Sequence, residues 1–181
     1  LDSSGLVASV AVVENDTLLA EYTVNYKKTH SQTLLPMLDE ISNMTELDLS
    51  TIDAIAVAGG PGSFTGLRIG SATAKGLGLA LEKPLISIPT TAAIAYNIWD
   101  TDKFVCPIMD ARRNQVYTGV YCYTDHRLDT VWEQDTMSIE ALAEGLNCLD
   151  HEVIFLGDGV AVYREKLEAL LTIPFSFAPA H

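Results

Sequence analysis

A glycine-dense stretch at residues 58–68 (AGGPGSFTGLR) holds the residue types best suited to binding a ligand in this chain. Glycine adopts backbone conformations closed to other residues, so such a turn brings main-chain amides close either to an anionic group or to a packed surface. The stretch follows a strand predicted at residues 52–58 and opens a helix predicted at about residues 66–81, which we expect Ser63 and Thr65 to cap. The turn alone leaves anion binding and packing both open. Its residues of interest are Gly59, Gly60, Gly62, Ser63, Thr65, Gly66 and Arg68.

The common phosphate-binding and hydrolase signatures do not fit this stretch. A Walker A loop requires Gly-x-x-x-x-Gly-Lys before a serine or threonine, and no lysine precedes a hydroxyl residue here. Gly60, Gly62 and Gly66 give a loose G-x-G-x-x-x-G that lacks an acidic residue at the distance expected for ribose binding. A serine hydrolase centred on Ser63 would need glycine at the position of Pro61.

Three further turns carry polar groups or glycines that could face a nucleotide: residues 2–5 (DSSG), 110–113 (DARR) and 157–159 (GDG). They occupy the places where a two-lobed, actin-like ATPase holds phosphates, metal and nucleoside. Each is alternatively an ordinary turn in which an aspartate caps backbone amides. Their matched positions favour common ancestry with nucleotide-binding proteins over present hydrolysis. The candidate vestigial nucleotide site comprises Asp2, Ser3, Ser4, Asp110, Gly157, Asp158 and Gly159.

A catalytic metal site is not favoured. A helix grips one metal ion with two histidines about one turn apart, and His30 has Leu34 at the second position. The other histidines lie far apart in sequence without ligand spacing. A metallopeptidase is therefore the least favoured class of enzyme, and we assign no metal ligand and no catalytic residue.

The elements that would position these turns occur twice along the chain. The first half predicts a hairpin (7–13 and 18–25), a helix from residue 34, the strand at 52–58, the glycine turn and its helix, a short strand (85–88) and a helix (91–99). The second half predicts three strands (104–109, 115–123, 128–134), a helix (139–146), a strand (153–156), a glycine turn and a helix through Leu170. We therefore predict two α/β lobes, residues 1–101 and 102–181, each with a mixed sheet and flanking helices.

The helix after the glycine turn carries small residues on one face. Gly66, Gly70, Ala74 and Gly78 recur every four residues, and each glycine inside a helix costs roughly 1 kcal/mol against alanine. Something large must pack on that face. It is either the chain's own sheet or a helix of another subunit, which would also meet the helix that carries Leu34, Leu38 and Ile41.

Composition limits the partners and the location. The chain has 181 residues, with 24 acidic and 11 basic side chains, and the net charge of −13 opposes direct, unaided binding of nucleic acid. Three scattered cysteines indicate neither a disulfide framework nor a zinc knuckle, which fits a reducing cytoplasm. No apolar run approaches the ~20 residues of a membrane span. We expect residues to be missing at both ends, because the chain opens at Leu1 and residues 173–179 read as an extended segment without its continuation.

Residues 59–70 (GGPGSFTGLRIG) closely resemble the signature of the bacterial TsaB (YeaZ, glycoprotease-like) family of tRNA threonylcarbamoyladenosine biosynthesis proteins. Residues 30–36 (HSQTLLP), 110–117 (DARRNQVY) and 157–159 (GDG) are similar to further hallmarks of that family. The matches follow the family's order across nearly the whole chain.

The resemblance implies an actin-like (ASKHA, ribonuclease H-like) duplicated fold without catalysis of its own. Such a chain acts as a cytoplasmic scaffold and activator for TsaD, a homologous metal-bearing subunit that transfers a threonylcarbamoyl group to a tRNA adenosine. A small ATPase, TsaE, docks on the pair. The resemblance further implies that tRNA is reached only through the complex, that ATP or ADP and metal belong to the complex, and that no membrane is involved. TsaD keeps two metal-binding histidines, and the pair His30 and Leu34 separates this chain from it.

By the same resemblance the pairing surface is built from the helices at residues 34–44 and 67–81. Because large apolar patches seldom stay bare, we expect the isolated chain to pair with itself through that surface. The alternative function is an actin-like ATPase or sugar-kinase-like enzyme that uses Asp2, Asp110 and residues 157–159 around a magnesium nucleotide. A metallopeptidase is a weaker alternative. The interface residues expected from this pairing are Leu34, Leu35, Leu38, Ile41, Leu67, Gly70, Ala74, Leu77 and Gly78.

Overall fold

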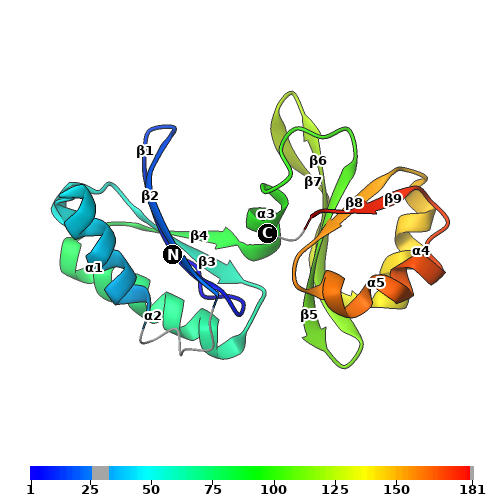
Figure 1. Ribbon diagram of the computed structural model, residues 1–181, viewed down its shortest axis with the longest axis horizontal. Helices are drawn as coiled ribbons and strands as arrows, with labels where there is room; N and C mark the ends of the chain where they lie inside the picture. The colour runs from blue at the N-terminus through cyan, green and yellow to red at the C-terminus, as the bar shows by residue number, and fades with distance from the viewer. Residues whose placement is uncertain (26–32, 180–181) are drawn as a thin grey trace. The chain divides into compact units, whose positions relative to one another are not determined.

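The computed structural model describes residues 1–25 and 33–179, and its backbone divides at the short helix after Pro89 into units Leu1–Thr90 and Thr91–His181 (Figure 1). The division falls before the boundary expected after residue 101, because helix α3 (Thr90–Ala95) packs into the second unit. Its Ala95 is fully buried against Val105 and Tyr121.

The first unit is built from two short sheets joined by the first residues of the chain. Leu1 donates from its nitrogen to the Ala56 carbonyl (2.9 Å) and accepts from the Ala58 amide (3.0 Å), while Asp2 forms an antiparallel bridge with Ser9. Leu1 thus lies against the strand that contains Ala56 and Ala58. The elements are the antiparallel hairpin β1 (Ala8–Glu14) and β2 (Thr17–Val24), the parallel pair β3 (Ile55–Gly60) and β4 (Leu85–Pro89), the 3₁₀ turn η2 (Leu49–Thr51), and the helices α1 (Leu34–Thr45) and α2 (Phe64–Leu81).

Helix α1 covers the hairpin. Its buried residues Leu34, Met37 and Ile41 recur every three to four positions and pack on Ala8 and Val10 of β1. Helix α2 covers β3 in the same way, with Ala74 packed on Ile55 and Val57. These two contacts form the core of the first unit.

The second unit is a mixed five-stranded sheet in the order β7-β6-β5-β8-β9. Strand β6 pairs antiparallel with β5 and β7, whereas β8 pairs in parallel with β5 and β9. The apolar side of helix α4 packs with that of α5 and with Phe155 in one buried cluster. The bounds are β5 (Phe104–Arg112), β6 (Gln115–Thr124), β7 (Arg127–Ser138), α4 (Ile139–Leu149), β8 (Val153–Leu156), α5 (Gly159–Leu170) and β9 (Phe175–Phe177).

The predicted order of elements is confirmed, with differences at their ends. Strand β3 starts after η2, where Asp48 accepts a hydrogen bond from the Ser50 amide and turns the chain. Helix α2 begins at Phe64, and Ser63 caps it as predicted by accepting from the Gly66 amide (3.3 Å), whereas Thr65 lies inside the helix. Across the described residues, no helix is long and apolar enough to span a bilayer.

The small-residue face of α2 lies on the first unit's own backbone and sheet. The buried residues of this helix are Gly66, Gly70, Ala74 and Gly78. A Cβ at Gly66 would overlap the Ser3 carbonyl oxygen, one at Gly70 would lie 2.7 Å from Ser3 Oγ, and one at Gly78 would lie 2.8 Å from Leu85 Cδ2. The glycines therefore allow close approach of this chain to itself.

The prediction that Gly70, Ala74 and Gly78 contact another subunit is wrong, because their own unit covers them. Leu34 and Ile41, predicted for the same surface, are only 1% and 3% exposed. The remaining residues of that prediction are Leu38, Leu67 and Leu77, which are half-buried, and Leu35, which is 51% exposed.

We expect Gly66→Ala to lower the free energy of unfolding by at least about 2 kcal/mol, because the new Cβ meets a backbone oxygen that cannot move aside. Gly76→Ala is the matched control: nothing lies within 4 Å of its Cβ, and the better helix propensity should add roughly 0.5–1 kcal/mol. Urea denaturation followed by circular dichroism measures both. Equal stability of the two variants would contradict the close packing at Gly66.

Candidate functional site

The glycine turn of the first unit rests on the aspartate-led turn at Asp2. The Ser63 amide donates to the Ser4 carbonyl (2.6 Å), and a Cβ at Gly62 would overlap that same carbonyl oxygen. Ser3 Oγ donates to the Gly66 carbonyl (2.9 Å), and Ser3 and Ser4 are both buried. The turn is therefore closed against backbone on this side.

Asp2 completes this arrangement from within its own turn. Its Oδ1 accepts a hydrogen bond from the Ser4 amide (2.7 Å), which fixes the two serines that the glycine turn contacts. This is the local turn geometry that aspartate favours without any ligand.

The second unit repeats the same construction. Asp110 Oδ1 accepts from the Arg112 amide (2.9 Å), as Asp2 does from Ser4. Gly157, with φ of +99°, and Gly159 lie against the Ile108 carbonyl, which a Cβ at either position would crowd. The Asp110 amide donates to Asp158 Oδ1 (3.3 Å) and ties the two turns together. In both units glycines approach backbone next to an aspartate: Gly62 and Gly66 meet Ser4 and Ser3 just after Asp2, whereas Gly157 and Gly159 meet Ile108 just before Asp110.

The Asp110 carboxylate is engaged by neighbouring side chains. The Tyr163 hydroxyl donates to its Oδ1 (3.0 Å), and Arg112 Nη1 lies 3.3 Å from its Oδ2. Burial raises the pKa of Tyr163, and the adjacent Asp110 carboxylate raises it further. Burial likewise raises the pKa of Asp158; the hydrogen bond from the Asp110 amide opposes this rise, and the negative charge of Asp110 adds to it. The carboxyl groups of Asp110 and Asp158 thus lie close together in one small site.

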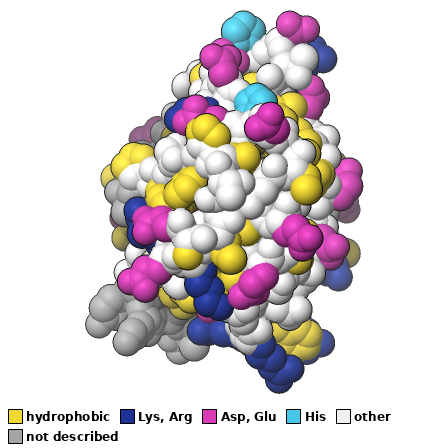
Figure 2. Space-filling model, turned by 90° about the vertical axis from the view of Figure 1, so that its right-hand side faces the viewer, with side chains coloured by type: hydrophobic (Ala, Val, Ile, Leu, Met, Phe, Trp, Pro, Cys, Tyr) yellow, Lys and Arg dark blue, Asp and Glu magenta, His cyan; other side chains and the backbone are white. Residues whose placement is uncertain are grey.

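The residues predicted as a vestigial nucleotide site form two separate groups. Asp2, Ser3 and Ser4 lie with the glycine turn in the first unit, whereas Asp110, Gly157, Asp158 and Gly159 lie together in the second. Nucleotide binding stays a prediction. The carboxylates of the second group would repel phosphate, and acidic side chains are also spread over the face shown in Figure 2.

Metal ligands do not gather in the described part of the chain: residues 1–25 and 33–179 contain no group of three or more histidine, cysteine, aspartate or glutamate side chains placed to hold an ion. His30, which entered the comparison with metal-binding helices, lies outside the described residues.

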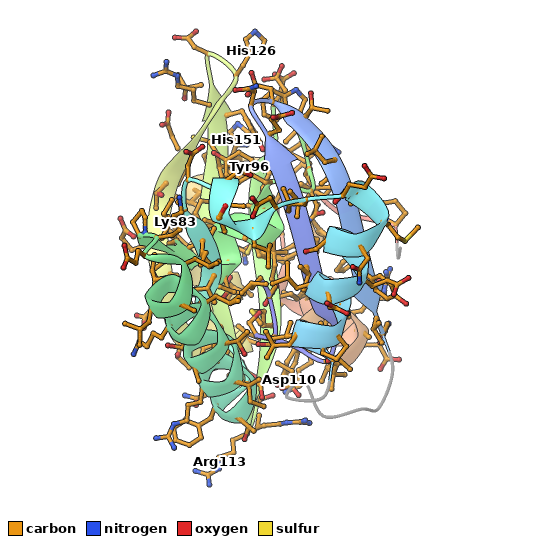
Figure 3. The ribbon with its side chains drawn as sticks, turned by 90° about the vertical axis from the view of Figure 1, so that its left-hand side faces the viewer. Lys83, Tyr96, Asp110, Arg113, His126 and His151 are labelled. Atoms are coloured by element: carbon orange, nitrogen blue, oxygen red, sulfur yellow. The ribbon has the colours of Figure 1, made fainter. Side chains whose placement is uncertain are left out.

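The outward faces of α1 and α2 expose four large apolar side chains, of which only Leu35 is among the interface residues expected from the sequence. Leu35 and Met44 of α1 are 51% and 76% exposed, and Phe64 and Leu79 of α2 are 68% and 84% exposed. The two helices contact each other, and Figures 1 and 3 show them side by side on the first unit. We call the exposed surface of these two helices the outer helix face; on α1, Leu35 and Met44 are nine residues apart and therefore lie on opposite flanks of that surface. The sequence carries a signal for Phe64 and Leu79, because helical periodicity places both on the side of α2 away from its buried glycines.

A shallow groove of about 440 Å³ lies on α2 within the outer helix face. The Arg68 guanidinium stacks over the Phe64 ring, 3.8 Å from its centroid, and Lys75 lines the same groove. Helix α2 carries no acidic residue, whereas α1 carries Asp39 and Glu40 and no basic residue. The outer helix face is therefore apolar with one acidic and one basic half.

A family model described as TsaD, tRNA N6-adenosine threonylcarbamoyltransferase, matches residues 17–178. The tRNA threonylcarbamoyladenosine biosynthesis protein TsaB of Bacillus subtilis (strain 168) is 34% identical to this chain over 171 residues, which cover 94% of this chain and 75% of that protein. The chain belongs to the TsaB family. The TsaB protein of Escherichia coli (strain K12) is 31% identical, with 88% of this chain and 70% of that protein covered.

Solved structures agree with this assignment to TsaB. YeaZ from Pseudomonas aeruginosa superposes with a TM-score of 0.83 at 28% sequence identity, covering 98% of this chain and 81% of that one. The resemblance drawn from residues 59–70 is confirmed, and so is the actin-like (ASKHA) α/β fold class.

The raised pKa of Asp158 predicts a pH-dependent stability. Its protonated form is favoured in the fold, so its stabilising contribution is complete below its ordinary pKa of about 4 and is lost as pH rises through the raised value. Asp158→Asn should therefore raise the midpoint of thermal unfolding by about 1–3 °C at pH 7 and leave it unchanged below about pH 4. Calorimetry at both pH values measures this, with exposed Glu165→Gln on α5 as the control. The same gain at both pH values would show that the ionised carboxylate is not its cause.

Proposed function

We propose that this TsaB-family chain is a non-catalytic subunit for threonylcarbamoyl transfer to a tRNA adenosine, and that it activates a homologous, TsaD-type catalytic subunit by pairing with it. The names of its relatives place them in tRNA threonylcarbamoyladenosine biosynthesis, and the matching family model describes the transferase. The proposed pairing is supported above all by one observation, the exposed outer helix face.

The outer helix face has the composition of a docking surface. Leu79, Met44, Phe64 and Leu35 each expose half or more of their side chains on two neighbouring helices of one unit. Exposed apolar patches of this kind mark interaction sites in soluble proteins. Between them on α2 lie exposed Ala72 and Gly76, where a partner helix can approach closely.

Charge supports a specific orientation of this pairing. The acidic half on α1 fits a basic helix of the partner, and the basic half on α2 fits an acidic one. A second copy of this chain, related by a two-fold axis, meets both conditions when α1 of one copy packs on α2 of the other. The isolated chain is therefore expected to form a homodimer that the TsaD-type subunit replaces.

The absence of catalysis is part of the proposal and is supported by how the turns are used. Asp2 and Asp110 both hold backbone amides of their own turns, and Asp110 also binds Tyr163 and Arg112. The rival ATPase or sugar kinase needs these carboxylates free for magnesium. Calorimetric titration of the isolated chain with Mg-ATP separates the two, because tight binding would favour the rival.

The remaining parts of the proposal rest on the family resemblance. A TsaE-type ATPase docks on the pair, ATP or ADP and metal bind in the complex, and tRNA is reached through the assembled subunits in the cytoplasm.

We expect Leu79→Asp and Met44→Asp to abolish co-purification with the TsaD-type subunit of the same cell and to reduce threonylcarbamoyladenosine in tRNA at least about tenfold, because each buries a charge in the interface. Both positions are exposed, so the free energy of unfolding should change by less than about 0.5 kcal/mol. Affinity purification and nucleoside mass spectrometry measure the two effects.

Val162→Asp is the matched control, since Val162 is a similarly exposed apolar residue on α5 of the second unit, 58% exposed. Undiminished co-purification of the Leu79 and Met44 variants would refute the outer helix face as the pairing surface. Gly70→Leu is unsuited to this purpose, because it disrupts the packing of the first unit itself.

A further inference from the structure

The hairpin between β5 and β6 has an unfavourable backbone at its tip. Arg112, Arg113 and Asn114 have φ of +68°, +53° and +63°. Because Arg112 pairs with Gln115, the loop itself consists of Arg113 and Asn114, in positions where glycine, asparagine and aspartate are preferred. Asparagine tolerates this conformation, whereas arginine adopts it at a cost in free energy. The fold alone therefore does not account for arginine at position 113.

Side-chain contacts hold the tip on both sides. Before it, Asp110 binds Tyr163 of α5 and the Arg112 amide. After it, Asn114 Nδ2 donates to both carboxylate oxygens of Glu140 on α4 (3.1 and 2.9 Å), and Lys166 of α5 donates to Asn114 Oδ1. Lys166 also lies 3.3 Å from Glu140 Oε1. Two helices thus fix the loop that presents residue 113.

No contact of the Arg113 side chain within the described residues offsets the cost of its backbone conformation. Its side chain is exposed and forms no hydrogen bond or ion pair with any residue in the ranges 1–25 and 33–179. Figure 3 shows Arg113 beyond Asp110, with its side chain pointing outward. The nearby carboxylates of Asp110 and Glu140 are already paired with Arg112 and Lys166. In a chain with 24 acidic residues, a loop held by two helices thus presents an unpaired guanidinium at its tip.

We propose that Arg113 is an RNA contact, which binds a phosphate of the tRNA backbone once the chain is assembled with its catalytic subunit. A planar guanidinium binds phosphate oxygens in a bidentate manner, and a pre-fixed loop loses little entropy on binding. The exposed Arg112 side chain, whose ion pair with Asp110 is long at 3.3 Å, supplies a second cation beside it. The inference rests on the proposed function, since the assembly delivers the RNA.

The net charge of −13 limits this contact to one or two phosphates. Such a contact orients RNA that other subunits hold, rather than capturing RNA from solution. An acidic protein surface is the competing partner for a free arginine, and the experiment below separates the two. RNA is favoured because the chain's relatives are named for tRNA modification and because a narrow two-residue tip meets single phosphates more readily than a broad acidic patch.

The test compares Arg113→Asn with Arg127→Asn, using fluorescence anisotropy with a labelled anticodon stem-loop RNA. Arg127 is an equally exposed arginine that follows the β6–β7 loop containing His126, at the opposite end of β6, so its loss changes the net charge equally. In the complex with the TsaD-type subunit, Arg113→Asn should weaken RNA binding about three- to tenfold and lower the slope of log affinity against log salt by about one. Arg127→Asn should change neither. The Arg113→Asn variant should unfold at the same or a higher temperature, because asparagine suits the loop.

The same variants are also measured as isolated chains at about 20 mM salt, where weak phosphate contacts are strengthened. The proposal requires the same difference there, so it can be judged even if the chain fails to pair with the TsaD-type subunit, which would refute the proposed function alone. Equal RNA binding by wild type and Arg113→Asn in both settings overturns the inference. Weaker affinity for the TsaD-type subunit with unchanged RNA binding overturns it in favour of an acidic protein partner.

Discussion

The structure depends on a close contact that occurs once in each unit, between a glycine turn and backbone that lies within two residues of an aspartate. In the first unit, Gly62 and Gly66 lie on the carbonyls of Ser4 and Ser3. In the second unit, Gly157 and Gly159 lie on the carbonyl of Ile108. No side chain fits between these backbones, so the contact fixes where α2 and α5 begin relative to their sheets. The aspartate-led turn and the later glycine turn, which occur twice in the sequence, are the segments that meet at this contact.

That contact also decides which surface of the first unit can serve a partner. Because Gly66, Gly70, Ala74 and Gly78 are used to bring α2 onto its own unit, only the opposite side of the helix is exposed. This side joins the exposed side of α1 into one apolar face with acidic and basic halves. A protein of strongly negative charge thereby keeps a basic helix where an acidic partner helix can bind.

The turns that resemble nucleotide-binding elements serve the fold in this TsaB-family chain. Asp2 and Asp110 each accept a backbone amide two residues ahead, and Asp110 also binds Tyr163 and Arg112. These aspartates therefore stabilise their own turns in the fold. The functional contacts proposed for this chain lie elsewhere, on a helix surface and at the β5–β6 tip.

The order of strands and helices, the helix cap at Ser63 and the family signature at residues 59–70 followed from the sequence, because these depend on local periodicity, turn chemistry and a long specific motif. Tertiary structure decided what covers the small-residue face of α2. A spacing of four places Gly70, Ala74 and Gly78 on one side of a helix, but the covering atoms come from Ser3, Val57 and Leu85, which all lie outside that helix. The same reason applies to the glycine turn: the residue type permits close approach, and only the folded chain determines that the approaching group is its own backbone.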